Sequence, residues 1–283
     1  MGKKIFIIGS SGFIGKKLVH FLEKNNEIIP ISRHGENHKH ILNLADTKPN
    51  DSFLEANQIV IFLAATSSIE QCEKEYNNSY KINVENTAYI ISKALKLNNK
   101  VLFFSSDAVF GDDKEVVFND DGDRNPISNY GKMKKEIEEC FKNEPKFKAI
   151  RLPYIFSKND KFTKYYFDCL YKSKVVEVYH PFYRNVITMN MLLQAIYNLL
   201  RDWEKIPNNL INFAGNHLIS RINIIDALNC ALNENVQYII TTNQDFWKNR
   251  PMIVQMKSKV FAQLVNLDLD FFTMVKKELN NIG

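Results

Sequence analysis

A glycine-rich turn near the N-terminus constrains the fold more than any other feature of this sequence. The turn, Gly9-Ser10-Ser11-Gly12-Phe13-Ile14-Gly15, joins a continuous apolar run at Ile5–Ile8 to a helical pattern over Phe13–Leu22. Glycines at such a turn allow a tight reversal, and they let backbone N–H groups at the helix N-terminus approach a pyrophosphate. We therefore predict a strand–turn–helix unit that opens a dinucleotide-binding domain.

Apolar runs and helical patterns alternate through the first half of the chain. Strands are predicted at Ile5–Ile8, Glu27–Ser32, Gln58–Leu63, Lys100–Ser105 and Phe147–Leu152, and helices at Phe13–Leu22, Ser79–Leu97 and Ile127–Phe141. Continuous apolar strands separated by helices are typical of a parallel sheet that is covered on both faces. The expected fold class is α/β, a Rossmann-type doubly wound parallel sheet with ligands at the carboxyl ends of its strands.

The second half of the chain is less regular. It is predicted to contain an aromatic-rich helix around residues 165–171, strands at Val175–Tyr179 and Leu210–Phe213, and helices at Met189–Leu200, Ser220–Leu232, Ser258–Leu264 and Leu269–Leu279. We expect residues 1–152 to form the nucleotide-binding domain. Residues 153–283 are expected to form mainly a smaller α/β substrate-binding domain, with part of about 186–214 returning to the Rossmann core.

Composition excludes several classes of protein. The net charge of +5 is mild, the basic residues are scattered, and no nucleic-acid-binding signature is present. No stretch approaches the ~20 apolar residues of a membrane span. The four cysteines, Cys72, Cys140, Cys169 and Cys230, are far apart and form no C-x-x-C pair. This spacing indicates reduced thiols in a cytoplasmic protein, without a disulfide framework or a zinc site.

A tyrosine and a lysine four residues apart, Tyr130 and Lys134, lie on the helical pattern over Ile127–Phe141. Positions i and i+4 share a helix face. A nearby ammonium is expected to lower the pKa of the phenol, which suits Tyr130 to donate a proton to a carbonyl that receives hydride. Alone, the pair favours a surface tyrosine and lysine on an amphipathic helix, because this spacing occurs by chance in many chains. Its place after the glycine turn and the Ser105-Ser106-Asp107 run favours catalysis.

Arg33 stands at the end of the strand Glu27–Ser32, where an NAD-selective site usually has an acidic residue. An arginine there suits the 2′-phosphate of NADP, so the sequence favours NADP(H), with NAD(H) and a solvated loop charge as alternatives. The histidines that follow, His34, His38 and His40, are interpreted as part of a polar loop and not as a metal site.

These motifs together resemble the extended branch of the short-chain dehydrogenase/reductase superfamily, and within it the dTDP-4-dehydrorhamnose reductase type. The resemblance covers almost the whole chain. It rests on Asn43-Leu44-Ala45-Asp46, Leu63-Ala64-Ala65-Thr66, Glu73 with Asn83-Val84, Ser105-Ser106-Asp107-Ala108-Val109-Phe110, residues 130–138, Arg151-Leu152-Pro153 and Arg250-Pro251. Two positions depart from the family pattern. Ile137 stands where a glycine is common, and Asn185 stands where many members have an aspartate after the arginine equivalent to Arg184.

The resemblance implies a role for each matched residue. Catalytic roles fall on Ser106, Asp107, Tyr130 and Lys134. Cofactor contacts fall on Gly9, Ser11, Gly12, Phe13, Ile14, Gly15, Arg33, Leu44, Asp46, Leu63, Ala64, Ala65, Asn83, Tyr130, Lys134 and Pro153. Substrate contacts fall on Ser106, Asp107, Ala108, Arg184 and Arg250. In the implied mechanism, Ser106 and Tyr130 hydrogen-bond the substrate carbonyl, Tyr130 supplies the proton, and Lys134 holds the nicotinamide ribose. No metal ligand is assigned.

Ala108 separates this chain from some relatives. Nucleotide-sugar 4,6-dehydratases carry an Asp-Glu pair there, and GDP-fucose synthase-type enzymes carry a cysteine, whereas 4-epimerases often have alanine. The expected function is therefore NADP(H)-dependent reduction of a nucleotide-linked 4-keto-(6-deoxy) sugar, in surface polysaccharide precursor biosynthesis. The expected nucleotide is dTDP, with GDP and UDP as alternatives, and a homodimer is a family-level expectation. A 4-epimerase with tightly bound NAD and a non-catalytic subunit that senses NADP or a sugar nucleotide stay open.

Overall fold

The structure is a computed structural model that describes residues 4–34, 40–241 and 244–280. The chain divides into two compact units. The first runs to Val109 and includes Arg124–Arg151 and Pro207–Ile211, and the second consists of Phe110–Asp123, Leu152–Ile206 and the residues from Asn212 onward. Residues 110–123 thus belong to the second unit and residues 207–211 to the first.

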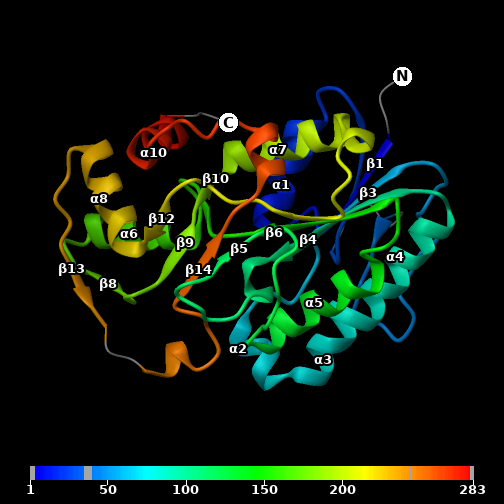
Figure 1. Ribbon diagram of the computed structural model, residues 1–283, viewed down its shortest axis with the longest axis horizontal. Helices are drawn as coiled ribbons and strands as arrows, with labels where there is room; N and C mark the ends of the chain where they lie inside the picture. Colours follow the sequence, from blue (N-terminus) through cyan, green and yellow to red (C-terminus); the bar gives the residue numbers. More distant parts are fainter. Residues whose placement is uncertain (1–3, 35–39, 242–243, 281–283) are drawn as a thin grey trace. The chain divides into compact units, whose positions relative to one another are not determined.

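The first unit is built on a six-stranded sheet with the order β11-β6-β4-β3-β1-β2 (Figure 1). The strands are β1 (Lys4–Ile8), β2 (Glu27–Ile31), β3 (Ile59–Phe62), β4 (Lys100–Ser106), β6 (Phe147–Leu152) and β11 (Leu210–Asn212). β1 pairs in parallel with both β2 and β3, and β3 pairs in parallel with β4. The prediction of a Rossmann-type parallel α/β sheet is confirmed.

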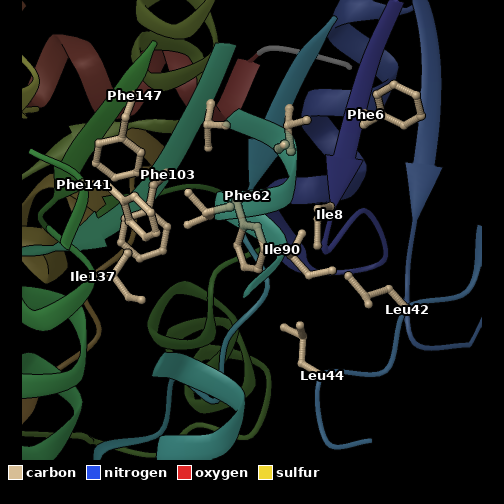
Figure 2. Close-up of a cluster of buried hydrophobic side chains, with 14 of the residues drawn as sticks. Phe6, Ile8, Leu42, Leu44, Phe62, Ile90, Phe103, Ile137, Phe141 and Phe147 are labelled. Carbon is tan, nitrogen blue, oxygen red and sulfur yellow. The ribbon is translucent and has the colours of Figure 1, made fainter. Parts of the chain in front are cut away.

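Helices cover the sheet of the first unit, and their apolar residues explain where they pack. They are α1 (Phe13–Leu22), α2 (Ile69–Lys74), α3 (Tyr76–Tyr80), α4 (Asn86–Lys96) and α5 (Asn129–Phe141). Ile90 of α4 and Ile137 of α5 join one hydrophobic core with Phe6, Phe62 and Phe103 from alternate positions of the strands (Figure 2). Since side chains alternate across a strand, Ile5 and Ile7 face the opposite side of the sheet.

The second unit combines short strands with five helices in the part of the chain that the structure describes. Its strands are β5 (Val117–Phe118), β7 (Ile155–Phe156), β8 (Val176–Val178), β9 (Tyr183–Asn185), β10 (Ile187–Thr188), β12 (Leu218–Ser220), β13 (Tyr238–Ile240) and β14 (Ile253–Met256). Its helices are α6 (Lys161–Tyr171), α7 (Met189–Arg201), α8 (Arg221–Leu232), α9 (Lys259–Leu264) and α10 (Phe271–Asn280). A four-stranded sheet, β12-β9-β14-β5, is accompanied by the pairs β10-β7 and β13-β8.

The helix predicted over Ser79–Leu97 is wrong in its extent. The chain is already helical from Ile69, and a π-helical turn at Lys81–Glu85 separates α3 from α4. The wider turn is consistent with the contact that Thr87 Oγ1 makes with the carbonyl oxygen of Ile82, five residues earlier, at 2.8 Å. Single π turns of this kind are frequent at functional sites. Among the helices described, none is long and apolar enough to cross a membrane.

Candidate active site

The turn between β1 and α1 is too tight for side chains at two of its glycines. Gly9 has a φ of +93°, and a Cβ there would lie 2.8 Å from the backbone nitrogen of Ala64. A Cβ at Gly15 would lie 2.3 Å from the carbonyl oxygen of Gly9. The backbone N–H groups of Gly9 and Ser10 both donate to the carbonyl of Ile31, at 2.9 and 3.1 Å. These contacts fix the turn at the carboxyl ends of β1 and β2.

The N-terminus of α1 has the features of an anion site. Gly12 is the N-cap and makes no side-chain cap, and the first turn of α1 contains no acidic residue. A Cβ at Gly12 would make one tight contact, 3.3 Å from the carbonyl oxygen of Gly9, and would meet no other atom within 4 Å. Ser11 and Phe13 are exposed beside it. Backbone N–H groups and the positive end of the helix dipole therefore fit the pyrophosphate of a dinucleotide.

The residues predicted for the adenosine end follow β2. Arg33 is exposed, and its Nε donates to Nε2 of His34 at 3.0 Å. Leu44 is buried, whereas Asp46 is exposed and accepts from the side-chain amide of Asn43 at 2.6 Å. His38 lies outside the described residues. Across the part of the chain with assigned structure, no three His, Cys, Asp or Glu side chains gather as a metal site.

Asn83 ties the loop after β3 to the π-helical turn. The N–H groups of Leu63 and Ala64 donate to the carbonyl of Ile8, at 2.8 and 3.1 Å, and Ala65 follows them. The buried Asn83 side chain accepts from the N–H of Thr66 at 2.8 Å and donates to the carbonyl of Thr66 at 2.9 Å. The Asn83 side chain therefore holds the loop after β3 through the backbone of Thr66.

Ser106 ends β4 and meets Asp107 and the start of α5. Its Oγ donates to Oδ1 of Asp107 at 3.0 Å and accepts from the N–H of Ala108 at 3.2 Å. Gly131 allows α5 to approach this turn, because a Cβ there would lie 2.0 Å from the carbonyl oxygen of Ala108. Close approach of the helix to the strand end brings Tyr130 near enough to Ser106 for the two side chains to interact electrostatically.

Two side chains fix the N-terminus of α5. Ser128 is the N-cap, and its Oγ accepts from the N–H of Gly131 at 3.0 Å. Glu73 of α2 accepts from the backbone and the side chain of Asn129, at 2.8 and 2.7 Å. Because Asn129 immediately precedes Tyr130, these bonds set the direction in which the phenol leaves the helix.

The expected lowering of the Tyr130 pKa by Lys134 is wrong for this structure. Burial and the carboxylate of Asp107 raise the pKa of Tyr130 well above its usual range, and the contact with Ser106 opposes them. Burial also lowers the pKa of Lys134 to about 7. Its Nζ donates to the carbonyl of Phe104 at 2.8 Å and lies 5.8 Å from the centre of the Tyr130 ring. At neutral pH the phenol is therefore protonated, and Lys134 loses its proton far more readily than an exposed lysine.

A buried ionic network lies one helical turn beyond Lys134. Glu138 accepts from Ser105 at 2.5 Å, from Nη2 of Arg151 at 3.0 Å and from Nη1 of Arg124 at 2.7 Å. Its negative charge raises the pKa of Lys134 and so partly offsets the effect of burial. Residues 130, 134 and 138 follow one another at helical spacing on α5, but the sequence analysis assigned no role to Glu138, because only the fold reveals its partners.

Cys72 of α2 is the neighbour that the sequence did not assign to this cluster. Its buried thiol donates to the carbonyl of Thr66 at 3.3 Å. It interacts electrostatically with Tyr130 and Lys134, and burial raises its own pKa. No motif marks this cysteine in the sequence, because α2 was not predicted as a helix.

The remaining predicted residues, Pro153, Arg184 and Arg250, belong to the second unit. Pro153 is buried directly after β6. Arg184 of β9 is buried and donates to the carbonyls of Tyr183, Pro251 and Met252, at 2.7, 2.7 and 3.1 Å. Its guanidinium therefore holds the backbone beside Arg250, which itself donates to the carbonyl of Phe246 at 3.1 Å.

A parallel sheet with this glycine turn, and a Ser–Tyr–Lys cluster after β4, define a Rossmann-type protein of the extended short-chain dehydrogenase/reductase class. Residues 3–277 match the family described as RmlD substrate binding domain. The chain belongs to this family.

Relatives with curated names cover part of the chain. The chain is 27% identical over 160 residues to a dTDP-4-dehydrorhamnose reductase of Aggregatibacter actinomycetemcomitans (54% of this chain, 52% of the relative). It is 28% identical over 150 residues to the spore coat polysaccharide biosynthesis protein SpsK of Bacillus subtilis (52% and 51%). It is 26% identical over 149 residues to a UDP-glucose 4-epimerase of Halalkalibacterium halodurans (48% and 45%). The chain thus spans about half the length of the curated relatives that it matches.

Solved structures resemble the chain over nearly its whole length. A hypothetical dTDP-4-dehydrorhamnose reductase from Sulfolobus tokodaii has a TM-score of 0.80 at 25% identity, covering 94% of this chain and 97% of its own. A dTDP-4-dehydrorhamnose reductase from Bacillus anthracis in complex with NADP has a TM-score of 0.84 at 18% identity, covering 99% of each chain. At 18% identity, the similarity to the Bacillus anthracis structure shows only that the two proteins share a fold.

Proposed function

We propose that this chain is an NADP(H)-dependent reductase of a nucleotide-linked 4-keto-(6-deoxy) sugar. The observation that carries the proposal is the cluster of Ser106, Tyr130 and Lys134 at the carboxyl end of β4. A protonated phenol beside a serine hydroxyl at a strand end suits carbonyl reduction, and a module that only binds a nucleotide has no use for it. This argues against the non-catalytic sensing subunit.

The chain's own residues supply the proton chemistry. A nicotinamide cofactor supplies hydride when it is bound, with the glycine turn and the N-terminus of α1 holding its pyrophosphate. Tyr130 stays protonated at neutral pH because burial raises its pKa, so its Oη is a proton donor to the substrate carbonyl oxygen. Ser106 would donate a second hydrogen bond to that oxygen by rotating its single hydroxyl hydrogen away from Asp107, to which it donates in this structure. Lys134 would hold the nicotinamide ribose and replenish the proton.

The preference for NADP(H) over NAD(H) is proposed on Arg33. Its exposed guanidinium follows β2, where an arginine accommodates a 2′-phosphate. The Bacillus anthracis structure was solved with NADP, which supports the choice. Leu44, Asp46, Leu63, Ala64, Ala65, Asn83 and Pro153 are proposed to line the remainder of the cofactor.

The substrate class is proposed from the relatives and from Ala108. Relatives are named a dTDP-4-dehydrorhamnose reductase and a spore coat polysaccharide biosynthesis protein, which supports a nucleotide sugar, dTDP-linked first, in polysaccharide precursor synthesis. Ala108 leaves the site without a second acid beside Asp107 for dehydration. The substrate roles of Arg184 and Arg250, a cytoplasmic setting and a homodimer remain proposals on the same resemblance.

A nucleotide-sugar 4-epimerase is the second candidate. One relative is named a UDP-glucose 4-epimerase, and a UDP-N-acetylglucosamine 4-epimerase from Methanobrevibacter ruminantium has a TM-score of 0.80 at 18% identity, covering 98% of this chain and 97% of its own. An epimerase returns the hydride to its substrate, so it retains its cofactor and consumes none.

The test is to mix the purified protein with NADPH or NADH and a panel of dTDP-, GDP- and UDP-linked 4-keto-6-deoxy sugars. The proposal predicts oxidation of the nicotinamide with one substrate, faster with NADPH than with NADH. An Arg33→Ala variant should lose that preference and keep activity with NADH. No oxidation, together with tightly bound NAD in the purified protein, would favour the epimerase.

A further inference from the structure

Arg221 begins α8 and lies among aromatic rings of the second unit. Its guanidinium carbon is 4.0 Å from the centre of the Tyr154 ring, 4.5 Å from that of Phe162 and 5.7 Å from that of Phe182. An arginine packed on aromatic faces is stabilised by cation–π attraction, but its N–H groups still need acceptors. Among these rings only Tyr154 carries an oxygen that can accept a hydrogen bond, and its hydroxyl does interact with Arg221.

One of these N–H groups has no acceptor. Nη1 of Arg221 is buried and makes no hydrogen bond. The nearby carboxylate of Asp160 accepts instead from the N–H groups of Ser157, Phe162 and Thr163 and from the hydroxyls of Thr163 and Tyr154. Burying a charged donor without an acceptor is costly, so its persistence here indicates a partner that binds from outside the chain.

Arg184 provides the contrast. Both arginines flank the Phe182 ring, with Arg184 at 4.2 Å from its centre. Arg184 uses its N–H groups on three backbone carbonyls, as described above, whereas Arg221 has an N–H left over. His180 in the same segment also has a buried Nδ1 without a partner, and its ring packs 5.6 Å from that of Tyr183. Two buried polar atoms without a hydrogen-bond partner, Nη1 of Arg221 and Nδ1 of His180, thus occur beside the aromatic residues around Phe182.

We propose that Arg221 is an oxyanion-binding residue for the substrate, a role distinct from those expected for Arg184 and Arg250. The inference rests on the proposed nucleotide-sugar substrate. The ligand chemistry is a phosphate or carboxylate oxygen that accepts from Nη1 of Arg221. Aromatic rings beside it, Phe182 against Phe246 and Trp247, offer faces suited to a nucleobase, so a nucleoside diphosphate is the expected source. A carboxylate on the sugar is the other source.

Calorimetric titration of the full-length protein tests this without turnover. For the wild type, dTDP should bind more tightly than thymidine. Arg221→Gln should weaken dTDP by about tenfold or more, because a hydrogen bond to a charged group is lost, and should leave thymidine unchanged. Arg201→Gln, at an exposed arginine paired with Asp202 at the end of α7, is the matched control and should bind as the wild type does. In the second arm, the affinities for UDP-glucuronate and UDP-glucose are compared, because only the former carries a carboxylate on the sugar. Tighter binding of UDP-glucuronate by the wild type is called the glucuronate preference.

The two arms separate the sources of the oxyanion. Loss of the dTDP-over-thymidine preference assigns Arg221 to the diphosphate, and loss of only the glucuronate preference assigns it to a sugar carboxylate. Unchanged affinities in both arms would overturn the inference. Should Arg221→Gln fail to fold, Arg221→Lys keeps the stem and the charge but loses the planar fork, and wild-type affinity in that variant would equally overturn it. Nicotinamide oxidation is measured separately, so failure of the reductase proposal remains distinguishable.

Discussion

Among single residues, Lys134 has the most unusual electrostatic environment in the cluster. Its ammonium is buried, lies 4.4 Å from the centre of the Phe103 ring, and has the carbonyl of Phe104 as its acceptor. Desolvation outweighs the attraction of Glu138, so the pKa falls to about 7 from a usual 10.5. Between these two values the unfolded chain binds the proton and the folded chain does not. The free energy of unfolding therefore gains from this residue as pH rises from about 7 towards 10.5, and loses that gain as pH falls.

Lys134→Met should remove this pH dependence. Urea unfolding of the cofactor-free wild type and of the variant at pH 7 and at pH 9.5 measures it. The wild type should gain stability relative to the variant by up to about 1.4 kcal/mol per pH unit in this window. Titrating groups that do not interact with Lys134 cancel in the comparison, and a Cys72→Ala background removes the one thiol that does. A difference between the two proteins that is flat with pH would show that Lys134 keeps an ordinary pKa.

Some properties of these residues could be predicted from the sequence, and others could not. The spacing of Tyr130 and Lys134 was sufficient to place both side chains on one face of α5. The direction of the Tyr130 pKa shift was not accessible, because it depends on how completely the packing of α5 against the end of β4 removes water. Arg221 carried no signal at all, since its aromatic neighbours come from three separate segments of the chain.

Among the elements, the sequence predicted α1 correctly but did not predict the π-helical turn. The bounds Phe13–Leu22 were predicted as observed, because the glycine turn and the apolar spacing are local signals. The π-helical turn at Lys81–Glu85 was missed, because it accompanies the contacts of Asn83 with Thr66, which is 17 residues away in the chain. The local sequence pattern predicts the bounds of a helix correctly when packing only buries one of its faces. It does not predict them when contacts with a residue distant in the sequence change the backbone of the helix.

A pair of glycine variants tests the role assigned to the turn before α1. Gly15→Ala should destabilise the protein by roughly 1–3 kcal/mol, because its Cβ would lie 2.3 Å from the carbonyl oxygen of Gly9 and must push α1 away from β1. Gly12→Ala is the matched control. Its Cβ would make a single tight contact, 3.3 Å from the carbonyl oxygen of Gly9, so the stability loss should be smaller than for Gly15→Ala while NADPH binding weakens. Denaturant unfolding and NADPH titration measure the two effects; equal stability losses would contradict the assignment.

Across the whole molecule, the two units are interleaved along the sequence. Pro207–Ile211 belongs to the first unit although some 55 residues of the second precede it. The N–H of Ala149 in β6 donates to the carbonyl of Asn209 at 2.7 Å, and every residue of β6 is buried. The sequence pattern predicted a strand at Leu210–Phe213, and β11 spans Leu210–Asn212. The pattern did not show which strand β11 lies beside, because the pairing of strands depends on the fold.

A fragment of residues 1–152 should therefore fold poorly. Without β11, the buried strand β6 would become an exposed edge, which favours aggregation. We expect the fragment to lack a cooperative unfolding transition, and the same fragment joined through a flexible Gly/Ser linker to residues 203–213 to regain it. Circular dichroism during thermal unfolding distinguishes the two. Cooperative unfolding of the shorter fragment would show that β11 is dispensable.

The central claim is that the Ser106–Tyr130–Lys134 cluster reduces a carbonyl, with Tyr130 as the proton donor. The most direct measurement compares Tyr130→Phe with the wild type, using NADPH and the sugar nucleotide that the wild type reduces. Turnover should fall about hundredfold or more, because the general acid is lost, while the affinity for NADPH stays within about threefold. Turnover close to that of the wild type in the Tyr130→Phe variant would contradict the account.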